Sequence, residues 1–108
     1  MANTFNNEFT HLTLATQAVY TAPAATGNIA IVLLAQATNI ASGAQAVTLC
    51  VYTSGAKETE LVLNLSVPEK AAVGLIAGKL VLKAGQSLYA NSSAGSLIDM
   101  NISVLEIT

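Results

Sequence analysis

Apolar and polar residues alternate along most of the chain with a period of two, which is the period of β-strands. Every second residue is apolar in residues 47–53, and the same alternation continues through residues 60–67 and 98–104. Such segments are typical of half-buried antiparallel strands, with one apolar and one polar face. Residues 29–37 are apolar on both faces, which predicts a central strand that is covered on both sides. At Val104–Leu105 the alternation slips, so that Leu105 and Ile107 face the other way. This slip predicts a bulge there, or a last strand that is buried on both faces.

Turn signals separate these segments at intervals typical of an all-β sandwich or barrel. They contain Gly, Pro, Asn or Ser and lie at residues 23–28, 42–43, 54–55, 84–85 and 92–95. Pro68 is expected to end the strand before it, because proline cannot donate a hydrogen bond to the ladder. Residues 69–77 are expected to be a loop that leads into a short strand. The pattern therefore predicts an all-β fold, an antiparallel β-sandwich of about eight strands.

The length of 108 residues is that of one domain, which can bury a core without disulfides or metals. Residues 1–10 are rich in Asn and Thr and are predicted to be an N-terminal arm, with residues 11–108 forming a single β-sandwich domain. Phe5 and Phe9 are the candidate interface residues, because exposed aromatic side chains on a polar segment are typical anchors.

Charged residues make up 9% of the chain, against a usual quarter, while hydrophobic residues make up 53%. Interface cores exclude charged residues, so the composition favours oligomerisation, although a monomer with a Ser/Thr/Asn surface is the alternative. The net charge of −2, with no Arg and scattered Lys, argues against nucleic-acid binding. No segment approaches the ~20 apolar residues of a membrane helix, and no secretory signal is visible. Cys50 is the only cysteine, which suits a protein assembled in a cytoplasm.

Groups that could perform chemistry are scarce, so we expect no enzyme, metal site or cofactor. His11 and Asp99 could form two members of a catalytic triad, but no positioned serine accompanies them. Cys50 is expected to be a buried small hydrophobic residue. Glu58 and Glu60 could form an acid–base pair, although a solvated hairpin end is the commoner explanation.

Tyrosines offer the one route to sugar binding, because the chain has no Trp. Glycan binding would require clustering of Tyr20, Tyr52 or Tyr89 on the surface beside Asn or Asp99. Tyrosines that lie separately at sheet or subunit surfaces are the favoured interpretation.

Two parts of the sequence resemble small virion proteins of tailed bacteriophages. The first comprises VYTAP at residues 19–23 and NIAIVLLAQATN at residues 28–39. The second comprises KLVLKAGQSLYAN at residues 79–91 and the closing SVLEI at residues 103–107. This ending is similar to that of capsid decoration (cement) proteins and of related neck, tail and fibre sandwiches. Many such chains carry an acidic residue where this one has Gln86.

The resemblance implies a jelly-roll-like sandwich that binds and stabilises a shell of major capsid protein. It also implies a homotrimer on the capsid surface of a virion that is assembled in the host cytoplasm. The alternatives are a neck, baseplate or tail-fibre β-domain of a phage, or a host-glycan-binding module.

Overall fold

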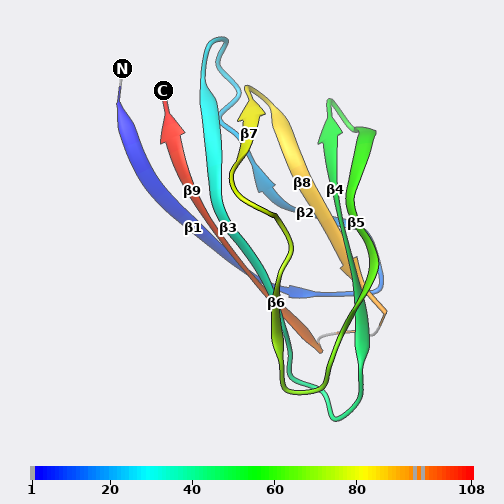
Figure 1. Cartoon of the computed structure of the whole chain (residues 1–108). Coiled ribbons are helices and arrows are strands. Elements are labelled where there is room, and N and C mark those ends of the chain that lie inside the picture. The colour runs from blue at the N-terminus through cyan, green and yellow to red at the C-terminus, as the bar shows by residue number, and fades with distance from the viewer. Residues whose placement is uncertain (1, 94, 96) are drawn as a thin grey trace.

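Two antiparallel sheets pack face to face in the computed structural model, which describes residues 2–93, 95 and 97–108. The described residues form nine strands (Figure 1). The larger sheet has the order β1-β9-β3-β6, and β7 also pairs with β3. Its strands are β1 (Asn3–Leu12), β3 (Ile29–Asn39), β6 (Ala72–Gly74), β7 (Leu80–Lys83) and β9 (Ile98–Ile107). The smaller sheet has the order β2-β8-β4-β5. Its strands are β2 (Gln17–Thr21), β4 (Gln45–Thr53), β5 (Ala56–Val67) and β8 (Gln86–Ser92).

The strands pair as though the chain were one long hairpin rolled across both sheets. From the ends inwards, β1 pairs with β9, β2 with β8, β3 with β6 and β7, and β4 with β5. This nesting is the jelly-roll arrangement, so the expected antiparallel sandwich is confirmed. The strand count is nine rather than about eight because two short pieces, β6 and β7, share the position opposite β3. Gly78, with a φ of 83°, lies in the segment that separates them.

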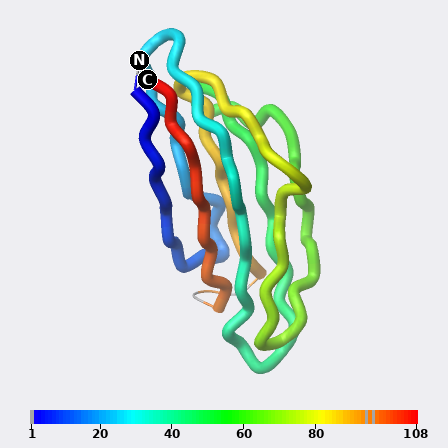
Figure 2. The backbone as a smooth tube through the Cα atoms, turned by 60° about the vertical axis from the view of Figure 1, so that its left-hand side comes forward, coloured from blue at the N-terminus to red at the C-terminus, as the bar shows by residue number. Residues whose placement is uncertain are grey.

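The N-terminal segment belongs to the larger sheet, so the prediction of a separate arm over residues 1–10 is wrong for residues 3–10. β1 pairs with β9 without interruption from Asn3 opposite Ile107 to Leu12 opposite Ile98, and the two strands run side by side in Figure 2. Most of β1 is exposed on both faces, so its sequence lacks the alternation of a half-buried strand. Its place in the sheet comes from backbone hydrogen bonds, which leave no sequence pattern. Met1 lies outside the described residues.

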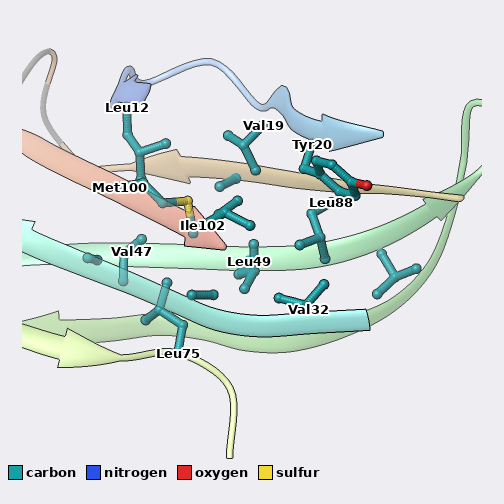
Figure 3. Close-up of a cluster of buried hydrophobic side chains, with 14 of the residues drawn as sticks. Leu12, Val19, Tyr20, Val32, Val47, Leu49, Leu75, Leu88, Met100 and Ile102 are labelled. Carbon is teal, nitrogen blue, oxygen red and sulfur yellow. The ribbon is translucent and has the colours of Figure 1, made fainter. Parts of the chain in front are cut away.

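The core lies between the inner faces of the two sheets. Figure 3 shows Met100 and Ile102 of β9 packed near Leu49 of β4 and Leu88 of β8, with Leu12 beside them. All five side chains are at most 1% exposed. Burial of a large aliphatic side chain stabilises a fold by about 1.5–3 kcal/mol, so this cluster is the main source of cohesion between the sheets.

The slip in alternation near the C-terminus has a different cause from the two expected ones. β9 stays in continuous register with β1, and the register shift lies in β3, between Val32 and Leu34. Along β9 the inner positions continue through Val104 to Glu106. Leu105 and Ile107 occupy outer positions and are only half-buried. The outer face of the sheet therefore becomes apolar towards this end.

The expected turns fall between strands wherever the structure describes them. Ser54 and Gly55 join β4 to β5 with φ angles of 52° and 82°, as in a two-residue type I′ hairpin. The turn expected at residues 92–95 includes Ala94, which lies outside the described residues. No helix among the described residues is long and apolar enough to cross a membrane.

Candidate functional site

A row of four apolar side chains crosses the outer face of the larger sheet. The register places Phe5 of β1 opposite Leu105 of β9, Leu105 opposite Ile31 of β3, and Ile31 opposite Val81 of β7. Phe5 is 75% exposed and Val81 is 56% exposed, while the two side chains between them are half-buried. Cross-strand neighbours of this kind contact one another, so the row forms one continuous surface.

The irregularity in β3 adds a fifth apolar side chain to this row. Leu33 is the extra residue at the register shift and is 37% exposed. With Phe5 it lines a shallow hollow of about 250 Å³, together with Asn6, Asn7, Ser103 and Val104. We refer to Phe5, Ile31, Leu33, Val81 and Leu105 together as the apolar face.

The apolar face contains no charged residue. In the adjacent cross-strand row, Ile107 and Ile29 extend the apolar surface, with Asn3 at one end and Lys83 at the other. Contiguous exposed apolar surface on a soluble domain marks an interaction site more often than singly exposed apolar residues do. This end of the larger sheet is therefore the best candidate site on the molecule.

Of the two candidate interface residues from the sequence, Phe5 belongs to the apolar face and Phe9 lies farther along the same strand. Phe9 is 72% exposed and sits in a polar row with Asn101 and Gln36. Sequence reasoning missed Ile31 and Val81, because any strand position can face either side until its partners are known. Besides Phe5, Leu105 was the one residue of the apolar face that the sequence pattern marked, since it broke the alternation.

His11 and Asp99 are brought together, as cross-strand partners in β1 and β9. Their Nδ1 and Oδ1 atoms are 2.5 Å apart, and the His11 side chain is 77% exposed. The small hollow beside them is lined by Phe9, Thr10, Met100 and Asn101, so no serine or cysteine of the described residues lines it. The pair is therefore exposed to solvent and, among the described residues, has no serine or cysteine beside it. Its geometry is that of an exposed hydrogen bond between the two side chains.

Cys50 is 2% exposed, which confirms that it is buried, but it points away from the core between the sheets. Its Sγ lies 3.6 Å from the carbonyl oxygen of Tyr89. Glu60 of β5 is its cross-strand neighbour and also forms an ion pair with Lys57. Burial, reinforced by the charge of Glu60, raises the pKa of the Cys50 thiol. A thiol in this state is a poor nucleophile, since the thiolate is the reactive form.

Cys50 is expected to react with iodoacetamide about a hundredfold more slowly in the native protein than in urea, because it is both buried and protonated. The native rate should also begin to rise at a higher pH than the denatured rate, since folding raises the pKa. Mass spectrometry of alkylated chain over time measures both rates. Equal native and denatured rates would contradict the burial of Cys50.

The three tyrosines do not form one cluster. Tyr52 and Tyr89 stack on the outer face of the smaller sheet, with ring centroids 4.0 Å apart. Tyr20 is 5% exposed, and its hydroxyl donates a 2.6 Å hydrogen bond to Glu106 Oε2, which links β2 to β9. Burial and this bond raise the pKa of Tyr20 well above its usual range. Tyr20 is therefore a structural residue.

Within residues 2–93, 95 and 97–108, no three His, Cys, Asp or Glu side chains gather in a way that could hold a metal ion. Glu58 is exposed on β5, while Glu60 pairs with Lys57.

At the level of sequence, no protein-family model and no curated protein matches the chain.

Two solved structures illustrate the similarity of the fold to known proteins. One is a chain of the disulfide-linked pili that form Bacillus endospore appendages, with a TM-score of 0.62 and 11% identity over 99% of this chain and 87% of that one. Another is a chain from the acid-stable capsid of Helicobacter pylori bacteriophage KHP30, with a TM-score of 0.56 and 10% identity over 100% of this chain and 89% of that one. At such low identity these likenesses show a shared fold.

Proposed function

We propose that the chain is a structural virion protein that decorates a capsid, binding and stabilising the shell of major capsid protein. The observation that carries this proposal is the apolar face, an uncharged surface that crosses four strands. Burial of apolar surface is favourable by roughly 25 cal/mol per Å². No charged group has to be desolvated within the row, which makes the surface suited to lasting contact with another protein.

The fold and the sequence support the same assignment. The jelly roll resembles a chain of the KHP30 capsid in shape, and the turn-and-strand motifs resemble those of phage decoration proteins. In this role the chain acts by binding alone, on the outer surface of a virion that is assembled in the host cytoplasm. Many identical weak contacts then add through multivalency.

The likeness to the pilus chain would favour a fibre subunit, but this alternative is less well supported than a capsid decoration protein. The pili in question are linked by disulfides, whereas the only cysteine of this chain is buried. A neck, baseplate or tail-fibre domain would use the same fold, and differs from a decoration protein in copy number per particle. Glycan binding is supported least, because Tyr52 and Tyr89 each cover one face of the other ring.

Binding to purified empty capsids tests the proposal. The wild-type chain is expected to co-sediment with the shells at hundreds of copies per particle, as decoration requires. Phe5→Asn is expected to weaken this binding about fivefold or more, since an exposed aromatic anchor at an interface contributes at least about 1 kcal/mol. Quantitative gel analysis of the pelleted shells measures the occupancy.

Leu63→Asn is the matched control, because Leu63 is 65% exposed on β5, in the other sheet. It should bind shells like the wild type. If both variants bind equally well, the apolar face is not the contact surface. If the wild type ignores shells, the decoration role is wrong.

A further inference from the structure

β1 is the one long, regular and unprotected sheet edge among the described strands. Exposed edges invite pairing with other chains, and proteins usually guard them with short strands, bulges, lysines or prolines. β6, β7 and β2 are only 3, 4 and 5 residues long, and β5 is interrupted by three register shifts. β1 has 10 residues in unbroken register with its neighbour and contains no Lys or Pro.

The lysines are also distributed unevenly between the sheet edges. All four lie between residues 57 and 83, on or between the strands of the opposite edges: Lys57, Lys70, Lys79 and Lys83. The opposite edges of both sheets are therefore protected by cations, and the β1 edge is left without them.

The backbone of β1 presents hydrogen-bonding groups along its free side. Ala2 and Thr108 exchange both backbone hydrogen bonds, at 2.8 and 2.9 Å. Since bonded and non-bonded pairs alternate along an antiparallel ladder, the even-numbered residues of β1 face β9 and the odd-numbered residues face outwards. The outward residues are Asn3, Phe5, Asn7, Phe9 and His11. The N–H group of Asn7 donates a hydrogen bond to Asn6 Oδ1 at 2.9 Å. A strand that pairs with β1 at Asn7 would replace this local bond.

We propose that this edge pairs with β1 of a second copy of the chain, antiparallel and about a two-fold axis at Asn7. Outward residues must lie opposite outward residues, and only the register centred on Asn7 pairs all five of them. In this register Phe5 of each copy lies opposite Phe9 of the other, so two Phe5–Phe9 pairs form. Asn3 of each copy likewise lies opposite His11 of the other. Aromatic cross-strand pairs of this kind add to the stability of a sheet.

Charges on the two copies are compatible with this register. Glu8 lies opposite the neutral Asn6 of the second copy, and no like charges lie directly opposite each other. The two Glu8 side chains are diagonal neighbours, about 7–8 Å apart, and are exposed to solvent. Pairing would also bring the Phe5 end of one apolar face beside Phe9 of the other copy. The strand therefore complements itself, which favours a second copy as the occupant.

Charge exchange at position 7 tests the register, because Asn7 is exposed and meets its own copy on the axis. Sedimentation equilibrium of the wild type is expected to show a concentration-dependent dimer. Asn7→Lys and Asn7→Asp should each weaken this dimer about tenfold, since two like-charged side chains then project from Cα atoms about 5.5 Å apart. An equimolar mixture of the two variants should restore it. Asn7→Ala is the matched control and should dimerise normally, and Glu8→Gln should tighten the dimer about two- to threefold.

A wild type that remains monomeric at a chain concentration of about 1 mM would overturn the inference, because a dimer with a Kd of about 1 mM would already be visible there. So would an oligomer that tolerates Asn7→Lys, or a mixture that fails to recover. This inference does not rest on the proposed function. A trimer that binds shells and is indifferent to position 7 would exclude β1 pairing and leave the decoration role standing. A dimer that is sensitive to position 7 and ignores shells would support β1 pairing and exclude the decoration role.

Discussion

Asn39→Ala is expected to lower the free energy of unfolding by about 3 kcal/mol, because one buried amide connects three backbone groups. Asn39 ends β3 and is 0% exposed. Its Nδ2 donates to the carbonyl oxygens of Gly43 at 2.8 Å and Val67 at 2.9 Å, and its Oδ1 accepts from the amide of Ala41 at 2.8 Å. Alanine would leave all three groups without this partner inside the fold. Urea denaturation followed by circular dichroism measures the change.

Asn101→Ala provides the control for this loss. Asn101 is half-buried on the outer face of β9, and its amide makes no hydrogen bond with any described residue. Its replacement should change stability by about 0.5 kcal/mol or less. Similar losses of stability at both positions would show that the three hydrogen bonds of Asn39 do not contribute to the free energy of unfolding.

Leu49→Ala is expected to cost about 2–5 kcal/mol, through lost burial and the cavity that it leaves. Leu49 is 0% exposed on β4 and lies in the middle of the cluster between the sheets (Figure 3). The neighbouring strands are held in two ladders, so the space can collapse only in part. The midpoint of urea denaturation should fall accordingly.

Leu63→Ala removes the same atoms from an exposed position on the neighbouring strand. Leu63 is 65% exposed, so its truncation should be nearly neutral, within about 0.5 kcal/mol. A small effect of Leu49→Ala, comparable with that of Leu63→Ala, would contradict the position of the core.

The sequence predicted those parts of the fold that depend on alternating burial. The strands around Leu49 and Met100 have one face in the core, so their period of two was visible. β1 was missed because neither of its faces is buried over most of its length. An edge strand of this kind is held by backbone bonds to its neighbour, and the residues that make those bonds can be of almost any type.

The candidate site was predictable in part, for a related reason. Phe5 stood out as an aromatic residue in a polar segment, and Leu105 stood out because it broke the alternation. Ile31 and Val81 gave no such signal, since the row that they complete exists only once β3 lies between β9 and β7. Asn39 was also missed, because its burial and its bond to Val67, 28 residues along the chain, exist only once the strands are in place.

The hydrogen-bonded pair of Ala2 and Thr108 places the two ends of the described chain side by side (Figure 2). A tension that draws these two residues apart acts across the ladder, along the direction of its hydrogen bonds. It would separate β1 from β9 one residue pair at a time. A load applied along the length of β1 would instead be shared by all its pairs at once. The molecule is thus mechanically anisotropic, and it should resist a load along its strands far better than traction on its two ends.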